Sequence, residues 1–306
     1  MTLLDKAIVR ALPAVPRSVV RRVAAPYIAG PTLDDARRVV AELNGRGMSA
    51  TVDVLGEEIA REDEARAIAR AYHEALSAIE TAELDANVSI KLTGFGLKLD
   101  PALCRSLVEE LVRDAERKGI FVRIDMEDSS TTDETLDLYR ALRAAGHDRV
   151  GVVLQAALRR TLADIAALAP LRPSVRLCKG IYVEPPSLAF QEFDAIRKSF
   201  VAALDALFEA GCRPAIATHD EWLLQRSLER IAGLHRSAYE FQMLLGVREG
   251  LRDAIVADGH RLRVYVPFGE QWYAYSLRRL RENPAIARHV AKAVLTGEGL
   301  RRRRRS

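Results

Sequence analysis

The sequence predicts an α/β protein built on a (β/α)8 barrel of the TIM type, with an N-terminal helical arm. Short runs rich in β-branched residues recur along the 306 residues and alternate with helical patterns rich in Ala, Leu, Arg and Glu. Several runs, such as residues 150–154, are continuously apolar, which is typical of parallel strands buried on both faces. The first and last runs span about 215 residues, which fits the usual barrel size of roughly 250.

The predicted elements alternate along the chain. The eight strands are Ser49–Val54, Val88–Leu92, Phe121–Met126, Val150–Leu154, Val175–Cys178, Ala215–Thr218, Tyr239–Leu244 and Arg261–Val266. The clearest helices between them are Glu58–Ile79, Pro101–Arg117, Thr132–Ala144, Phe190–Ala210 and Trp222–Ile231. Two helix starts have the residue spacing of a capping box, Thr131 with Glu134 and Thr32 with Asp35.

The alternative to a closed barrel is a doubly wound nucleotide-binding sheet. That fold places a glycine fingerprint after a strand and before a helix. The one candidate, residues 45–50, has the reverse order, because it follows a helix and precedes a strand. We interpret Asn44 and Gly45 as the end of a helix and a turn. The chain also lacks a P-loop, so we expect the barrel.

No stretch rich in Pro, Gly or Ser divides the chain into two domains. We therefore expect a helical arm over residues 1–45, a single barrel over 46–295 and a basic, disordered tail over 296–306. The tail contains Arg301–Arg305, and such blocks of like charge usually repel and stay extended in solvent. The alternative for this tail is a loose anchor on an anionic membrane surface.

Composition places the chain among ordinary globular proteins. Hydrophobic residues make up 49% and charged residues 29%. No apolar run approaches the roughly 20 residues that span a bilayer, and the first residues lack a signal-peptide pattern. We therefore expect a cytoplasmic protein.

The net charge argues against a nucleic-acid-binding enzyme, and the spacing of the cysteines and histidines argues against disulfide or metal sites. The net charge is only +4, and the terminal arginines supply more than all of it, which argues against a nucleic-acid-binding enzyme. The three cysteines are far apart, and the six histidines form no HxH or HxxxH pair. We therefore expect neither a disulfide framework nor a metal site.

Polar residues stand at nearly every predicted strand end, where the active site of a (β/α)8 barrel lies. They are Glu57, Lys91, Asp125, Glu127, Gln155, Arg176, Lys179, Tyr182, Thr218, His219, Asp220, Glu240, Gln242 and Tyr265. Any one of them alone is more often a structural polar group or a solvated loop residue. Together they predict a large, polar ligand that contacts many strands.

The helix after the last strand carries a further cluster. Tyr275, Arg278, Arg279 and Glu282 stand at i, i+3, i+4 and i+7, on one face of the helix. Two adjacent arginines near an aromatic ring could bind a small carboxylate through paired hydrogen bonds. The alternative is a surface helix with Arg–Glu pairs, and the spacing alone does not decide between them.

These residues resemble the proline dehydrogenase family. Residues 275–283 are similar to its YxxRRxxEN signature. Other similar segments, in family order, are 51–57, 89–93, 123–128, 153–155, 176–182, 217–220, 240–244 and 265–267. The resemblance covers roughly residues 25–290 and implies the stand-alone bacterial, FAD-dependent type, without a fused aldehyde-dehydrogenase or DNA-binding module.

The resemblance implies a role for each matched residue. Asp125 would lie beneath substrate and flavin as the catalytic acid, with Arg176 near the flavin N5. The implied substrate-binding residues are Lys91, Arg278 and Arg279 at the proline carboxylate, Tyr182, Leu244, Tyr265 and Tyr275 around the ring, Glu57 as the partner of Arg278, and Glu282, which would orient Lys91 or the arginines. The implied FAD contacts are Met126, Gln155, Arg176, Lys179, Gly180, Ile181, Thr218, His219 and Gln242.

The implied reaction is the oxidation of L-proline to 1-pyrroline-5-carboxylate by hydride transfer to the flavin N5. This is the first step of proline degradation to glutamate. Electrons would pass to a quinone-type acceptor, with peripheral contact at the inner face of the cell membrane as one arrangement. A separate pyrroline-5-carboxylate dehydrogenase would use the product. We expect the FAD to be bound without a covalent link.

Two departures and two alternatives accompany this interpretation. Residues 156–158 and Cys178 differ from the residues usual in relatives, which concerns local packing around the flavin rather than the chemistry. One alternative is a Schiff-base lyase or aldolase with Lys91 or Lys179 as nucleophile, since a lysine crowded by arginines would have a depressed pKa. The other is a ligand-binding barrel that has lost its activity.

Overall fold

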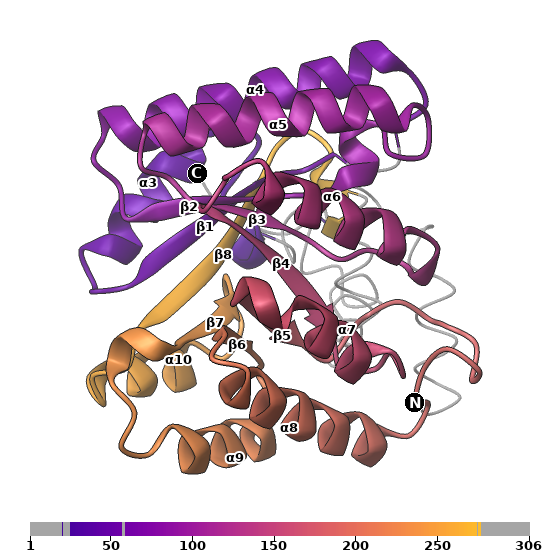
Figure 1. The fold of residues 1–306 in the computed structure, drawn as a ribbon. Helices are drawn as coiled ribbons and strands as arrows, with labels where there is room; N and C mark the ends of the chain where they lie inside the picture. Colours follow the sequence, from indigo (N-terminus) through magenta and orange to yellow (C-terminus); the bar gives the residue numbers. More distant parts are fainter. Residues whose placement is uncertain (1–19, 21–24, 57–58, 274, 277–306) are drawn as a thin grey trace.

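The computed structural model describes residues 20, 25–56, 59–273 and 275–276, and these form a closed barrel of eight parallel strands (Figure 1). Each strand pairs with the next along the chain, and β8 pairs with β1 to close the ring. The strands are β1 Ser49–Val54, β2 Ala86–Ile90, β3 Val122–Ile124, β4 Val150–Gln155, β5 Ser174–Cys178, β6 Arg213–Ala217, β7 Glu240–Leu244 and β8 Leu262–Phe268. The predicted fold class is confirmed.

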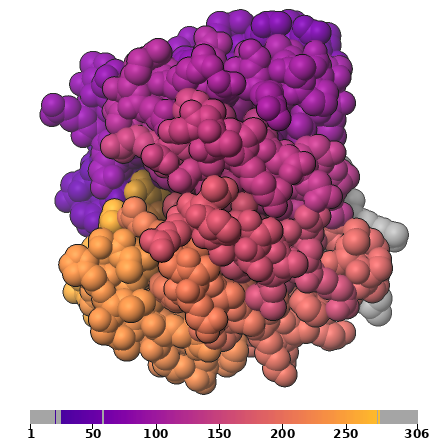
Figure 2. Space-filling model, viewed as in Figure 1, coloured from indigo at the N-terminus to yellow at the C-terminus, as the bar shows by residue number. Residues whose placement is uncertain are grey.

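Helices cover the outside of the barrel, and α4 and α5 lie side by side at the top of Figure 1. The α-helices are α3 Leu33–Asn44, α4 Glu62–Thr81, α5 Pro101–Arg117, α6 Thr132–Ala144, α7 Thr161–Leu168, α8 Phe193–Glu209, α9 Glu221–Ile231 and α10 Glu249–Ala257. Short 3-10 turns are η2 Ala25–Tyr27, η3 Leu92–Phe95, η4 Ser129–Thr131, η5 Ala169–Leu171 and η6 Arg236–Ala238. In Figure 2 the first half of the chain, indigo to magenta, lies above the second half, red to orange.

The helix α3 precedes the first strand and packs on both β1 and β8, where the barrel closes. Its buried residues Ala36, Val40 and Leu43 stand at i, i+4 and i+7 and face the barrel. The predicted capping box of Thr32 and Asp35 is present, and the helix ends at Asn44 as predicted. The division at residues 45 and 295 stays a proposal, because residues 1–19, 21–24 and 277–306 lie outside the described part of the chain.

Strand alternation explains why the barrel interior is polar. In each strand the aliphatic residues, such as Val52 and Ile90, join the hydrophobic core shared with the helices. The alternating residues point into the barrel and are polar on most strands; they include Asp53, Ser89, Arg123, Asp125, Arg176, Glu240, Gln242 and Arg263, all buried. Buried polar groups of this kind are costly unless they are hydrogen-bonded to one another.

Several local predictions were wrong, and the strand predicted as Val88–Leu92 is in fact Ala86–Ile90. The capping box of Thr131 with Glu134 is absent, because the chain first makes the turn η4, in which Asp128 accepts a hydrogen bond from the N–H of Ser130 at 2.9 Å. The hydroxyl of Thr131 instead donates to the backbone carbonyl of Asp128. Strand β3 is also shorter than predicted and ends at Ile124, so Asp125 and Met126 lie just beyond it.

Candidate active site

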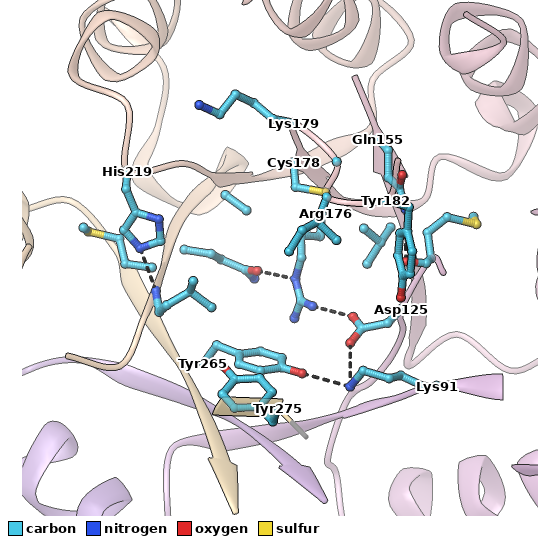
Figure 3. A pocket seen from close by; sticks show the side chains of 18 residues that line it. Lys91, Asp125, Gln155, Arg176, Cys178, Lys179, Tyr182, His219, Tyr265 and Tyr275 are labelled. Atoms are coloured by element: carbon cyan, nitrogen blue, oxygen red, sulfur yellow. Dashed lines mark hydrogen bonds and ion pairs between the residues drawn. The ribbon is translucent and has the colours of Figure 1, made fainter. Parts of the chain in front are cut away.

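A cavity of about 580 Å³, which we call the mouth cavity, opens at the carboxyl ends of the strands. It is the region shown in Figure 3. The predicted site residues that line it are Lys91, Asp125, Met126, Gln155, Arg176, Lys179, Gly180, Ile181, Tyr182, His219, Gln242, Leu244, Tyr265 and Tyr275. They come from β2 to β8 and from the helix after β8, so the mouth cavity can hold a ligand that contacts most strands.

Arg176 lies at the centre of the mouth cavity, and its guanidinium is fixed from three strands (Figure 3). Its Nη1 donates to Asp125 Oδ1 at 2.5 Å and to Ser89 Oγ at 3.2 Å, and its Nε donates to Gln242 Oε1 at 2.6 Å. Ser89 Oγ also donates to Asp125 Oδ1 at 2.7 Å. This buried network holds the cation in one position, which is what a charged group needs in order to act on a bound ligand.

Lys91 forms the second charged group of the mouth cavity. Its ammonium donates to Asp53 Oδ1 at 2.9 Å, contacts the Tyr265 hydroxyl at 3.1 Å and lies 3.7 Å from Asp125 Oδ2. The side chain is only 11% exposed, so solvent screens these contacts weakly. Asp125 therefore lies between the two cations, Arg176 and Lys91.

Asp53 belongs to the site and was missed by the sequence analysis. It is fully buried, also accepts a hydrogen bond from the Tyr72 hydroxyl at 3.1 Å, and has one oxygen, Oδ2, without a described hydrogen-bond partner. Burial and the nearby Asp125 raise the pKa of Asp53, while Lys91 opposes them. Strand alternation could have identified it, because an acid at an inward position of a buried strand needs a cationic partner.

Aromatic and apolar side chains surround these charges. Figure 3 shows Tyr265, whose hydroxyl contacts Lys91, with Tyr275 on the same side of the cavity and Tyr182 pointing toward Asp125. Tyr275 is 5% exposed and packs with Leu55 and Ile28. Burial, and then the charges of Asp53 and Asp125, raise the pKa of Tyr265 well above its ordinary value, so its hydroxyl stays protonated. The predicted wall of tyrosines is therefore compatible with the geometry of the described residues.

A second hollow of about 790 Å³ adjoins the mouth cavity and shares Lys179, Ala217, His219 and Leu244 with it. In this outer hollow Asp220 accepts from both nitrogens of the Arg197 fork, at 2.9 and 2.8 Å, and from Lys179 at 3.2 Å. Thr218 lines the outer hollow and not the mouth cavity, and its hydroxyl accepts from the N–H of Asp220. The outer hollow thus combines cations with the aromatic rings of Phe193 and Trp222.

The backbone at Gly180 lies close to the Gln155 side chain in the lining of the mouth cavity. Gly180 has a φ of +100°, and a Cβ there would lie 3.2 Å from both Ala157 Cβ and Gln155 Oε1. The Gln155 amide donates to the carbonyls of Met126 and Glu127 at 3.1 and 2.8 Å, which holds it in place. Opposite, His219 Nε2 accepts from the N–H of Leu244 at 2.9 Å, so the neutral ring carries its proton on Nδ1.

Some predicted residues are placed elsewhere or not described. Glu57, Arg278, Arg279 and Glu282 lie outside the described residues. Glu127 accepts from the backbone and hydroxyl of Thr93 and does not line the mouth cavity, so it holds the loop after β2. Glu240 begins β7 and lies at the opposite end of the barrel, because only the last residues of a parallel strand reach the mouth.

The electrostatic environment of the two lysines does not favour the Schiff-base alternative. Lys91 contacts Asp53 and Asp125, and Lys179 contacts Asp220. Carboxylates beside an amine favour its charged form, whereas a nucleophilic lysine needs cationic or apolar neighbours. Among the described residues, no group of three or more His, Cys, Asp or Glu side chains is arranged to hold a metal ion.

Comparisons with known proteins decide the family. A sequence model described as proline dehydrogenase matches residues 36–292. The chain belongs to the proline dehydrogenase family. It is 36% identical over 272 residues to proline dehydrogenase 1 of Bacillus subtilis subsp. natto, covering 88% of this chain and 89% of the relative. It is 34% identical over 278 residues to the proline dehydrogenase of Deinococcus radiodurans, covering 89% of each.

Fused relatives match over a part of their length. The chain is 27% identical to the bifunctional protein PutA of Escherichia coli, covering 88% of this chain but 24% of that protein. It superposes with a TM-score of 0.79 and 27% identity on the crystal structure of proline utilization A from Bdellovibrio bacteriovorus inactivated by N-propargylglycine, covering 86% of this chain and 33% of that one. The family resemblance, the barrel fold and the assignment to an oxidoreductase family of proline metabolism are thus confirmed.

Proposed function

We propose that the chain oxidises L-proline to 1-pyrroline-5-carboxylate with FAD as its cofactor, the first step of proline degradation to glutamate. The observation that carries the proposal is the set of fixed charges in the mouth cavity. Arg176 and Lys91 are held on either side of Asp125, at 2.5 and 3.7 Å. They line the mouth cavity of about 580 Å³, which adjoins the outer hollow of about 790 Å³.

FAD fits the residues present. Its flat ring system would lie in the mouth cavity, whose lining includes Gly180 and Gln155. Its diphosphate needs cations, and the outer hollow offers Lys179 and Arg197. The isoalloxazine would contact Arg176, Gln155 and Gln242, with Met126, Ile181, Thr218 and His219 as further contacts. When bound, the flavin supplies the two-electron oxidation by accepting a hydride from proline at its N5.

The protein's part in this reaction is to fix the substrate and shape the field. Lys91 presents an ammonium to a carboxylate in a cavity walled by Tyr265 and Tyr275, and the proposed Arg278 and Arg279 complete that clamp. A bound carboxylate positions the ring carbon next to nitrogen for oxidation, and such orientation is worth several kcal/mol of barrier. Arg176 would present positive charge to a bound flavin, while Asp125 keeps the guanidinium in position.

Proline must react with its nitrogen unprotonated, because only a neutral amine can donate electrons to the forming imine. The tyrosine wall with Leu244 excludes water, which strengthens every charge interaction within the cavity. Glu57 is proposed to pair with Arg278 and close the cavity over the substrate, and Glu282 to orient the cations.

The acceptor and the location are proposed from the family resemblance. We infer a quinone-type acceptor, a cytoplasmic protein, a separate pyrroline-5-carboxylate dehydrogenase for the product, and peripheral membrane contact as one role for the terminal arginines. No helix of the described residues is both long and apolar enough to cross a membrane.

Purified protein tests the proposal directly. We expect a yellow protein that releases free FAD on heating or acid treatment and reduces a soluble dye only when L-proline is added. Recovery of FMN, flavin that stays attached after denaturation, or a colourless protein trapped by borohydride with substrate would contradict it.

A further inference from the structure

The barrel has a second charged cavity at the end opposite the mouth cavity. This basal cavity has a volume of about 230 Å³ and is lined by residues at or just before the amino ends of the strands. No residue lines both cavities. Nothing in the proposed proline chemistry uses the basal cavity, so its charges need a separate explanation.

The lining of the basal cavity is strongly basic. It contains five arginines and two carboxylates: Arg123, Arg149, Arg213, Arg261, Arg263, Asp85 and Glu240. Glu240 is already bound, because it accepts from Arg263 Nε at 3.0 Å and from the Gln242 amide at 2.6 Å. Asp85 accepts from the Ser49 hydroxyl at 2.6 Å. Because the lining has five arginines and two carboxylates, the described side chains of the lining leave an excess of positive charge.

Arg123 is the deepest of these cations and has no carboxylate in contact among the described residues. It is 2% exposed and donates to neutral oxygens, the carbonyls of Val152 and Ser174 and the hydroxyl of Ser174. Its Nε and the Oδ1 of buried Asn87 have no described hydrogen-bond partner. A buried charge and buried polar atoms of this kind are costly unless a ligand satisfies them.

Arg213 and Arg261 form the exposed rim of the basal cavity. Neither guanidinium makes a hydrogen bond or ion pair to another described residue, although each stands beside like charge. Partial burial, and then the charge of Arg261, lower the pKa of Arg213, which reflects this crowding. Two unpaired arginines above a buried cation concentrate positive potential in a concave surface, which attracts small anions.

We propose that the basal cavity binds a small oxyanion of at least two negative charges, such as phosphate, and that this anion neutralises the arginines at the amino end of the barrel. Such an anion offers several acceptor oxygens at once, and guanidinium groups bind oxyanions in pairs of hydrogen bonds. A phosphate that carries a hydroxyl could also donate to Asn87. Binding there should stabilise the folded barrel, because the unfolded chain has no such site.

Calorimetric titration of the purified protein, cofactor included, with inorganic phosphate tests the proposal. Chloride is exchanged for phosphate at constant ionic strength so that general screening does not change. We expect one phosphate per chain and a thermal midpoint that rises with phosphate concentration. The double variant Arg213→Gln/Arg261→Gln removes both rim charges without breaking a described contact, and should lower the phosphate affinity by at least about tenfold.

A charge-matched control is the double variant Arg70→Gln/Arg105→Gln on the outer helices α4 and α5, which should bind phosphate as the parent does. Absence of phosphate binding to the parent would overturn the proposal. Equal affinity in the rim variant would also overturn it, because phosphate would then be bound elsewhere, for example in the outer hollow near Lys179.

Discussion

At the carboxyl end of the barrel the buried Arg176 is bonded to the side chains of Asp125, Ser89 and Gln242, whereas at the amino end the buried Arg123 donates mainly to backbone carbonyls. The described partners of Arg176 are side chains, so these hydrogen bonds hold no strand backbone in place. Arg123 instead bridges β4 and β5 through Val152 and Ser174. The same residue type is therefore held by side chains at the proposed catalytic end and by the backbone of two neighbouring strands at the other end.

The sequence shows the same difference. Gly151 interrupts the apolar strand β4 because a Cβ there would lie 2.6 Å from Arg123 Nη1 and 2.5 Å from the Ser174 carbonyl oxygen. Strand β4 therefore lacks a side chain at the position where the Arg123 guanidinium lies. At the mouth, a Cβ on Gly180 would lie 3.2 Å from Gln155 Oε1, so this glycine makes room for the Gln155 side chain.

The largest expected effect comes from Arg263→Gln at the amino end. Arg263 and Glu240 are each about 10% exposed on the side chain, and removing the arginine leaves a buried carboxylate without its main partner. Although burial acts to raise it, the charge of Arg263 holds the pKa of Glu240 below its ordinary range. We expect a loss of about 3–5 kcal/mol of unfolding free energy by urea denaturation. Activity of the folded fraction should stay within about twofold of the parent.

The matched change at the carboxyl end is Arg176→Gln. It also breaks a buried arginine–carboxylate pair, but this one adjoins the proposed cofactor and substrate. We expect kcat/KM for proline to fall at least about a hundredfold, which corresponds to roughly 2.7 kcal/mol of transition-state stabilisation, with an altered flavin spectrum. If Arg176→Gln and Arg263→Gln reduced activity equally, the division between the two ends would be wrong.

Arg279→Met tests the part of the mouth that lies outside the described residues. Methionine keeps much of the bulk but removes the charge, and losing a charge-assisted hydrogen bond costs about 1.5–3 kcal/mol. We expect the KM for proline to rise roughly ten- to a hundredfold in steady-state assays, with normal flavin content. Tetrahydrofuran-2-carboxylate should inhibit the parent competitively and lose affinity in step with proline; unchanged proline saturation would refute the clamp.

Asp114→Asn provides a reference value for the stability contributed by a charge network that belongs to neither end of the barrel. Although burial acts in the opposite direction, hydrogen bonds from His73, Arg117 and Lys118 lower the pKa of Asp114 to about 2, from an ordinary 3.8. A lowered folded-state pKa means that the stabilisation is present above about pH 4 and is lost as the pH falls through about 2. The variant should lose about 1 kcal/mol at pH 7, after solvent screening, and nothing near pH 2. A difference that persists at pH 2 would exclude this charge effect.

Much of the barrel could be predicted because strand periodicity is local. The strand β1 and the helices α5 and α6 have the predicted bounds, since apolar runs and helical faces are patterns of residues that are close in the sequence. The helices α7 and α10 were not predicted; they are short, at 8 and 9 residues, and give a weak periodic signal. The cap of α6 failed because the neighbouring Asp128 competes for the same turn.

The sequence predicted only those site residues that lie at strand ends or match the proline dehydrogenase family. Arg176 and Lys91 were found in this way, but Asp53 was not, because its importance lies in a contact with Lys91 from another strand. The basal cavity could not be predicted from the sequence either, since Arg123, Arg213 and Arg261 come together only when the barrel closes. Glu240 was grouped with the residues of the mouth although it stands near the start of the predicted strand, two residues before Gln242.

An anaerobic titration with L-proline shows whether the mouth cavity holds a flavin that oxidises proline. The visible absorbance of the purified protein should bleach in proportion to the proline added, and D-proline at the same concentration serves as the comparison. A flavin band that stays unchanged under saturating L-proline, or a protein that contains no flavin, would contradict the account.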